Sequence, residues 1–389
     1  MARSIKALIN PVMLKYGRES LGLSVGKVAG KLGISNQNLI DWEEGIDNPS
    51  LSTFEKLAKL YKRHTVFFYL PNVPNKCKRR EADFRTFPRY HSTPQPSLEF
   101  LHYLKDVYRR QAIALELLEE LEEKSVPRIP ASHLHENPED VAARLRLALN
   151  IISPTQFRWD ESYQALSAWI SAVEKLGILV FKSSHAKVPL EEMRGLAIWD
   201  ESLPAIALNA SDTDNGKIFT LMHELAHLSL HKNGVWGLHE NLSGSASDIE
   251  VFCNHVAGAI LVPNQALTEN PVVIPLPSDC DSLSDDDIRF IARKFCVSGE
   301  VILRRLLISG KISQSFYEEK CKYLRSLPIS KRGGGGNSQY AKKIVSREGS
   351  LFPNIVLRAM FAEKIPMNKA SSYLNTKVKH FGDLEALVL

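Results

Sequence analysis

The chain has 389 residues, 44% of them hydrophobic, and a formal net charge of +5. This length exceeds one ordinary compact core, so we expect two or three domains. This net charge is small for the length of the chain, so composition alone does not indicate a nucleic-acid partner. No apolar run reaches the ~20 residues of a membrane span and no secretory signal opens the chain, so we expect a cytoplasmic protein without a membrane partner.

The five cysteines are scattered along the chain and form no Cys-x-x-Cys pair. We therefore expect reduced, structural thiols in place of a disulfide framework or a thiolate zinc site. They are Cys77, Cys253, Cys280, Cys296 and Cys321.

Two short helices joined by a tight turn are predicted near the N-terminus. Ser24 can cap a first helix that Gly33 ends, and Ser35 can cap a second helix that Gly45 ends. This outline is typical of a helix-turn-helix, in which the second helix enters the major groove of DNA.

Candidate DNA contacts lie on and beside this second helix. Asn36, Gln37 and Asn38 begin it, and amide side chains pair well with adenine, although the same residues can also serve as capping and surface residues. Basic residues nearby are candidates to contact phosphates: Lys15, Arg18, Lys27 and Lys31. Acidic residues in the same region weaken the positive electrostatic potential that attracts DNA. We therefore expect tight binding to require a homodimer on a two-fold operator in double-stranded DNA.

The composition changes after the first segment. Residues 75–97 are rich in Lys, Arg and Pro, which marks a linker with a basic cluster at Lys76 to Arg80. Residues 98–124 carry apolar side chains at helical spacing and predict one long amphipathic helix, a spacer or dimer-forming element.

The remaining elements are predicted from the apolar pattern in chain order. Helices are expected at 141–149 and 161–176, before strands at 178–182, 194–199 and 204–209 and helices at 217–231 and 250–261. An irregular stretch from 264 to 287 precedes further helices. The expected domain limits are 1–74 for the DNA-binding domain, 75–130 for the linker and connector helix, 131–275 for a domain of mixed helices and strands and 276–389 for a helical C-terminal region.

The most specific motif is His-Glu-Leu-Ala-His at residues 223 to 227. Positions i and i+4 share one face of a helix, so His223 and His227 can bind one zinc ion while Glu224 points toward its water. Zinc lowers the pKa of that water, and the glutamate takes the proton and passes it to the leaving amine. With 12 histidines in the chain, the expected number of chance occurrences of this pattern in one chain of this length is roughly 0.02 to 0.03.

A catalytic zinc site uses three protein ligands, so a third ligand is expected downstream. Glu250 opens the helix at 250–261 and is the preferred candidate, and Asn254 on the same face can hydrogen-bond a ligand. Other residues remain as alternatives: His231, Asp248 and His255. No residue is assigned to stabilise the oxyanion; His239, Tyr163 and several arginines all remain open as candidates.

Two segments together resemble the ImmA/IrrE family of metallopeptidases. They are FTLMHELAH at 219–227 and EVFCNHVAGAILVP at 250–263. The resemblance implies a gluzincin-like site, with His223, His227 and Glu250 as zinc ligands and Glu224 as general base. The second segment departs from the family pattern at four apolar positions, which affect packing more than chemistry: Cys253, Val256, Ile260 and Val262.

The N-terminal segment resembles the XRE (Cro/repressor-like) family, through its capped recognition helix and the Glu43-Glu44-Gly45 turn. The two resemblances imply a mainly α fold with an α+β core. An XRE helix-turn-helix domain is then joined to a zincin-like (gluzincin) metallopeptidase domain and a helical C-terminal region.

The implied function is that of a zinc-dependent regulatory endopeptidase, whose activity can be latent. Its expected protein substrate is a partner transcriptional regulator, such as a helix-turn-helix repressor, in stress response or mobile-element control. The alternative is a DNA-binding transcription factor or antitoxin-like regulator whose zinc domain senses or binds without proteolysis.

Overall fold

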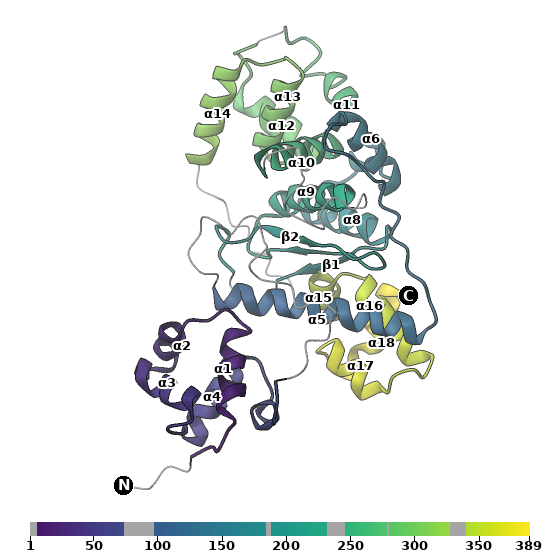
Figure 1. Cartoon of the computed structure of the whole chain (residues 1–389). Coiled ribbons are helices and arrows are strands. Elements are labelled where there is room, and N and C mark those ends of the chain that lie inside the picture. The colour runs from purple at the N-terminus through teal and green to yellow at the C-terminus, as the bar shows by residue number, and fades with distance from the viewer. Residues whose placement is uncertain (1–5, 74–96, 184–187, 232–245, 278–279, 327–339) are drawn as a thin grey trace. The chain divides into compact units, whose positions relative to one another are not determined.

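The computed structural model describes residues 6–73, 97–183, 188–231, 246–277, 280–326 and 340–389 (Figure 1). These fall into two compact units, Met1–His102 and Tyr103–Leu389. The basic cluster expected at Lys76 to Arg80 lies outside the described residues. The domain limits expected from the sequence stay a prediction.

The N-terminal unit is a group of short helices, and its two capped helices lie where the sequence predicts them. The Ser24 hydroxyl accepts a hydrogen bond from the amide of Lys27, and Gly33 ends that helix with φ 66° in the left-handed region. Ser35 caps the next helix in the same way. The elements are α1 (Pro11–Glu19), α2 (Val25–Leu32), α3 (Asn36–Glu44), α4 (Leu51–Leu60) and the 3-10 helix η1 (Thr65–Tyr69).

The C-terminal unit is built on a small sheet of three strands. They are β1 (Leu179–Lys182), β2 (Gly195–Ile198) and β3 (Ala205–Leu208), in the order β1-β3-β2. The central strand β3 is parallel to β1 and antiparallel to β2. Each strand begins and ends within one residue of its predicted limits.

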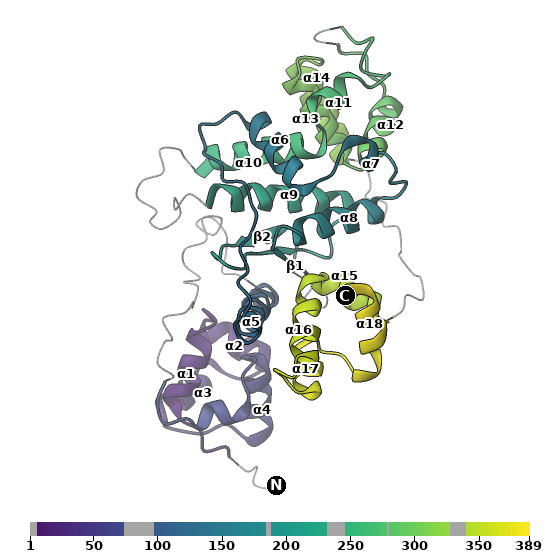
Figure 2. The same cartoon turned by 90° about the vertical axis from the view of Figure 1, so that its right-hand side faces the viewer.

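One face of the sheet is covered by α8 (Ser162–Glu174) and α9 (Asp214–His231), with α10 (Ala246–Leu261) and α6 (Pro138–Leu149) beyond them (Figures 1 and 2). Successive side chains of a strand point to opposite faces. Alternate strand residues therefore join the core on this side: Ile178, Val180, Ile206 and Leu208.

The opposite face is covered by α5 (Leu98–Glu120), α15 (Tyr340–Glu348) and α16 (Leu351–Phe361) (Figure 2). The Tyr103 hydroxyl of α5 donates to the carbonyl oxygens of Phe181 at 3.2 Å and Leu208 at 3.3 Å. The rings of Phe181 and Phe352 pack edge to face. From Tyr103 onward this long helix therefore packs on the sheet, a contact that the sequence did not predict, and its role as a spacer or dimer-forming element stays a prediction.

The C-terminal helices are tied to the core by one buried carboxylate. Glu174, at the end of α8, accepts hydrogen bonds from the amides of Ser350 and Leu351 and from the Ser350 hydroxyl. Gly349, with φ 70°, brings the chain to this contact. Although these bonds favour the charged form, burial dominates and raises the pKa of Glu174.

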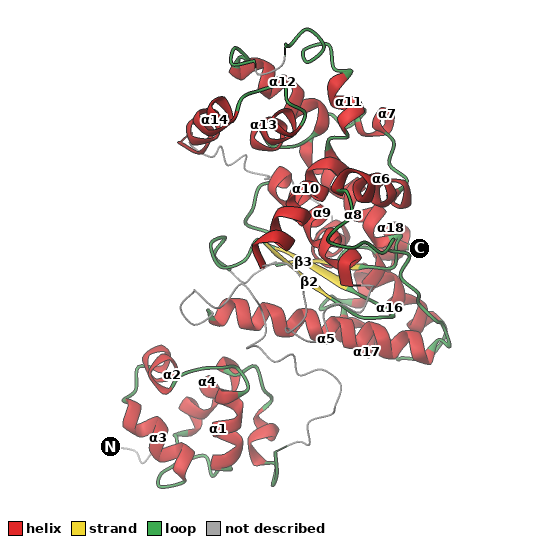
Figure 3. Ribbon diagram, turned by 45° about the horizontal axis from the view of Figure 1, so that its top comes forward, coloured by secondary structure: helices red, strands yellow, loops and turns green. Residues whose placement is uncertain are grey.

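Helices make up most of the described residues, and all the strands found there, β1 to β3, belong to the one sheet (Figure 3). The fold is thus mainly α with an α+β core, as predicted. Two short helices, α7 and α11, fall where none is expected. The remaining elements are α7 (Ser153–Gln156), α11 (Asn264–Thr268), α12 (Asp285–Phe295), α13 (Gly299–Ile308), α14 (Gln314–Ser326), α17 (Met367–Tyr373), η3 (Val378–His380) and α18 (Phe381–Val388).

Two expectations drawn from composition concern membranes and cysteines. Within the described residues, no helix combines the length and apolar character needed to cross a bilayer. Four cysteines there form no disulfide bond and are buried: Cys253, Cys280, Cys296 and Cys321. Cys77 lies outside the described residues.

Candidate functional site

The central motif lies on α9 and is buried. His223, Glu224 and His227 are 6%, 3% and 9% exposed. Isolated ionisable groups are rarely found at such depth without a partner or a metal ion. The burial of three of them within five residues therefore marks a site that serves more than packing.

The side chains of His223 and His227 meet that of Glu250, which comes from α10. The two Nε2 atoms lie 3.0 Å apart. Each lies 3.4 Å from one carboxylate oxygen of Glu250. Among the described residues, these three form the one group of His, Cys, Asp or Glu side chains with the spacing of a metal site.

These separations, 3.0 Å and 3.4 Å, are close to those between the ligands of a tetrahedral zinc ion. Zinc–nitrogen bonds of about 2.0–2.1 Å at a tetrahedral angle hold their nitrogens about 3.3 Å apart. Two imidazoles and one carboxylate are also a usual donor set for catalytic zinc. The residues present could therefore hold such an ion.

The other candidates for the third ligand are placed differently. His255 lies on α10 but pairs with Glu139 at 2.7 Å. Asp248 is exposed near the start of α10, and Asn254 is exposed one turn after Glu250. The side chain of His231 and the whole of His239 lie outside the described residues. Tyr163, considered for the oxyanion, is 61% exposed.

The backbone of β2 passes close beneath Glu224 because Gly195 has no side chain. A Cβ atom at Gly195 would lie 2.3 Å from Cγ2 of Thr220 and 3.3 Å from Cγ of Glu224. This close contact determines how near α9, which carries the motif, lies to the sheet. The sequence offered no signal for it, because an isolated glycine in a strand has several explanations.

The far end of α10 is held by three long polar side chains that the sequence did not single out. Arg146 donates to the carbonyl of Ile260, Gln156 to that of Leu261 and Arg305 to that of Val262. The last carbonyls of a helix have no partner within it. These contacts therefore stabilise the end of the helix that carries Glu250.

Arg305 and His255 both bind Glu139 on α6. The Arg305 side chain is 1% exposed and makes two hydrogen bonds to the Glu139 carboxylate. Burial acts to raise the pKa of Glu139, but hydrogen bonds from His255 and Arg305 outweigh it and lower the pKa to about 2. Glu139 therefore supplies the negative charge that the buried guanidinium needs.

In the N-terminal unit, the three candidate base contacts lie together at the start of α3. Asn36, Gln37 and Asn38 are all exposed. The amide of Gln37 donates to Asp41 one turn later. Lys31 is exposed and pairs with Glu99, and Lys27 on the same helix is half-buried.

Arg18 does not fit its expected role as a phosphate contact. Its guanidinium makes two hydrogen bonds to Glu43, at 2.7 and 2.8 Å, and a third to the carbonyl of Leu23. The pair is largely buried, so Arg18 joins α1 to α3 inside the domain. Charge alone could not distinguish this arginine from one available to DNA.

The comparisons with known proteins agree with this arrangement. Residues 173–307 match the family model described as the IrrE N-terminal-like domain of the M78 peptidases, and residues 14–68 match a helix-turn-helix model. No curated protein matches the chain. A solved structure of a Mycobacterium tuberculosis transcriptional regulator is similar at 16% identity and a TM-score of 0.27, over 44% of this chain.

The match spans about half of that regulator, 52% of its chain. The matched segments contain both clusters described above, because the metal-site residues fall in the first and the α2–α3 pair falls in the second. The chain therefore contains one segment similar to XRE-type helix-turn-helix domains and one similar to the IrrE N-terminal-like domain of the M78 peptidases, in the order that the ImmA/IrrE resemblance implies.

Proposed function

We propose that the chain is a zinc-dependent endopeptidase coupled to DNA binding, which cleaves a partner transcriptional regulator. The observation that carries the proposal is the convergence of His223, His227 and Glu250 on one point beside the buried Glu224. The comparisons support a regulator that contains a peptidase-family domain. Zinc, proteolysis and the nature of the substrate are inferred.

Each residue of the cluster has a distinct part in this proposal. The two imidazoles and Glu250 hold the ion, which when bound lowers the pKa of a coordinated water and polarises the scissile carbonyl. Glu224 accepts the proton of the attacking water and delivers it to the leaving amine. The low exposure of Glu224 keeps bulk water away from this proton transfer.

A peptide substrate can bind along β2, next to this carboxylate. Within the described sheet, β2 is an edge strand, and its residue Gly195 lies against Glu224. An extended peptide can add to such an edge through backbone hydrogen bonds. This mode of binding would carry the scissile bond past the metal ligands and favours an exposed, extended segment of a protein as substrate.

The DNA-binding end provides the regulatory part of the proposal. The exposed amides of Asn36, Gln37 and Asn38 can meet base edges, while Lys27 and Lys31 approach phosphates. A helix-turn-helix of this size is expected to bind tightly as a homodimer on a two-fold operator. Proteolysis of a second regulator would then be linked to the promoter that the chain occupies.

The decisive experiment compares the wild-type chain with Glu224→Gln, each loaded with zinc, on the helix-turn-helix proteins encoded by neighbouring genes. The variant should retain zinc by elemental analysis and lose about 10²–10⁴-fold in cleavage rate, because it removes only the general base. His223→Ala is the matched control and should lose metal and cleavage together.

Asn36→Ala separates the two activities. It should weaken operator binding and leave cleavage in solution unchanged. Cleavage that persists in Glu224→Gln would remove this residue from the mechanism. Operator binding by the wild-type chain without cleavage of any tested partner would favour a zinc domain that senses or binds without turnover.

A further inference from the structure

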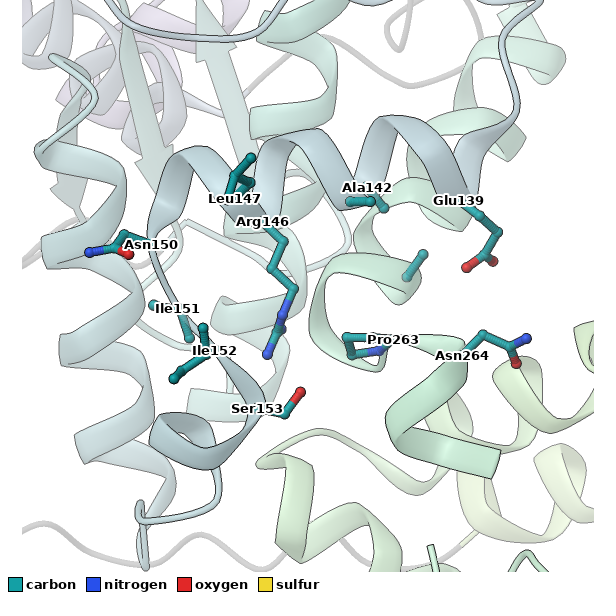
Figure 4. A pocket seen from close by; sticks show the side chains of 12 residues that line it. Glu139, Ala142, Arg146, Leu147, Asn150, Ile151, Ile152, Ser153, Pro263 and Asn264 are labelled. Atoms are coloured by element: carbon teal, nitrogen blue, oxygen red, sulfur yellow. The ribbon is translucent and has the colours of Figure 1, made fainter. Parts of the chain in front are cut away.

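A pocket lies on the side of α10 away from Glu250, between α6, the start of α7 and the start of α11. Its volume is about 420 Å³, within the range of ~300–1,000 Å³ that is usual for small-molecule sites. Figure 4 shows Arg146 extending from α6 into the space between Ile152 and Pro263, toward Ser153. We refer to it as the Arg146 pocket.

Most of the lining is aliphatic. The apolar side chains come from α6, the segment after it and the end of α10, and they include Ala143, Leu147, Ile152, Ala259 and Pro263. Leu147 and Ile152 are 82% and 61% exposed. Exposed aliphatic side chains around a concave surface are typical of a ligand site and cost solubility when nothing covers them.

Among the described residues, no carboxylate balances the charge of Arg146. Its Nη1 donates to the carbonyl of Ile260 and its Nη2 to the amide oxygen of Gln156, both neutral acceptors. It also lies over the ring of Trp169. Across the part of the chain that the structure describes, no carboxylate forms an ion pair with this guanidinium.

Glu139 lines the other end of the pocket but does not neutralise Arg146. Its carboxylate is already bound by Arg305 and by His255. Burial without an anionic partner lowers the pKa of Arg146 to about 10, whereas a guanidinium that gains a carboxylate recovers the lost solvation. A pocket with one unpaired positive charge and an aliphatic lining therefore suits a ligand that has one negative charge and an apolar remainder.

We propose that the Arg146 pocket binds a small organic monocarboxylate, whose charge pairs with Arg146 and whose apolar part lies against Leu147, Ile152 and Pro263. The bound carboxylate accepts the N–H groups of Arg146 that Ile260 and Gln156 leave unused. Because Arg146 also holds the last turn of α10, the ligand orders the helix that carries Glu250 at its other end.

Calorimetric titration of the full chain with octanoate tests the proposal. Wild-type protein should bind octanoate saturably, and octanamide, which has the same chain without the charge, should bind at least about tenfold more weakly. Octanoate should also raise the melting temperature. No saturable binding of octanoate, or equal binding of octanamide, overturns the proposal.

Three variants locate the binding. Arg146→Gln keeps a donor for the Ile260 carbonyl and should abolish octanoate binding. Ser153→Asp places a carboxylate beside Arg146 and should abolish binding while it maintains or raises the melting temperature, so loss of binding cannot be ascribed to unfolding. Arg144→Gln is the matched control, since this exposed arginine of α6 pairs with Glu136 and does not line the pocket.

The control should bind octanoate as the wild type does. Unchanged binding in Arg146→Gln overturns the proposal. If that variant does not fold, Ser153→Asp decides, and unchanged binding there has the same meaning. Because none of these measurements uses metal or cleavage, the outcome is independent of the proposed peptidase activity.

Discussion

Gly195 shows how a single missing side chain sets the geometry of the candidate metal site. Its backbone lies under the turn of α9 that runs from Thr220 to Glu224. Nearby, the carbonyl of Ala207 on β3 lies 3.2 Å from the position that a Cβ would take. Atoms of α9 and of β3 therefore fill the space on both sides of Gly195, and a larger side chain here would have to displace the helix or the strand.

We expect Gly195→Ala to destabilise the chain by about 1–3 kcal/mol, because the added methyl overlaps Thr220 and cannot retreat into the sheet. Zinc affinity should fall as well, since α9 must shift. Urea denaturation and metal titration measure the two effects. A second change, Thr220→Ser, removes the overlapping Cγ2 and should restore part of both losses; a double variant no better than Gly195→Ala would contradict this account.

Glu139 makes stability depend on pH in an acidic window. Its pKa is about 2 in the folded chain and about 4.3 in an unfolded chain. The folded state thus releases this proton more readily, so the stabilising contribution is complete above pH about 4.3 and is lost as the pH falls toward about 2.

Glu139→Gln should therefore lower the free energy of unfolding near neutral pH by about 2 kcal/mol, because Arg305 keeps a hydrogen-bond partner but loses its counter-charge. The difference from wild type should shrink through the acidic window. Urea denaturation at a series of pH values measures it. A difference that stays constant down to the lowest pH would show that Glu139 acts through packing alone.

At the scale of elements, α10 is held at both ends by side chains from other helices. Glu250 faces the histidines of α9 near its start, and at its end Arg146, Gln156 and Arg305 bind successive carbonyls. Gln156 is fully buried and also donates to the carbonyl of Phe295. It therefore joins α10 to the end of α12.

Gln156→Leu should cost about 2–3 kcal/mol, since it leaves two buried carbonyls without a donor. Gln314→Leu is a matched control, because this exposed glutamine bonds only to Glu318 on its own helix. Urea denaturation compares them. Equal stability of the two variants would mean that α10 does not depend on this contact.

The elements also show what could be predicted from sequence. Local signals sufficed for α2 and α3, where Ser24, Ser35 and two glycines define the ends, and for the i, i+4 spacing of the histidines. The position of Glu250 near the start of the downstream helix was enough to select it, and the structure brings it to the two histidines; its role as a metal ligand stays a prediction. The partners of α5 could not be predicted, because an amphipathic pattern does not identify the surface that it covers.

The contacts that hold the site in place were also beyond prediction from one sequence. Gln156 and Leu261 are separated by 105 residues, and Arg305 and Glu139 by 166. No local pattern brings such residues together, and Gln156, Arg305 and Glu139 are each of a polar type that usually lies at the surface. Only the tertiary fold pairs them.

At the scale of the whole molecule, the contact of Glu174 with Ser350 and Leu351 joins the C-terminal helices to the domain that carries the candidate site. Gly349 combines a left-handed φ of 70° with tight surroundings, because a Cβ there would lie 2.1 Å from Oε1 of Glu174 and 2.8 Å from the carbonyl of Val180. Both features require glycine.

Gly349→Ala should lower the free energy of unfolding by more than about 2 kcal/mol and increase hydrogen exchange in α15 and α16. Gly382→Ala in α18 is the matched control, since a methyl there meets no atom within 4 Å, and helix propensity predicts a gain of up to about 1 kcal/mol. Hydrogen exchange measured by mass spectrometry compares the two. Equal protection of α15 and α16 in both variants would contradict this view of the contact.

The same contact has a consequence for the order in which the chain is made. Ser350 follows Glu174 by 176 residues, so a ribosome releases all three candidate metal ligands long before the donors that Glu174 needs. During that interval Phe181 lacks Phe352, and the part of the sheet that α15 and α16 later cover is open to water. A chain cut short before Ser350 would therefore carry all three candidate ligands, but its sheet would be only partly covered on one face and prone to aggregate.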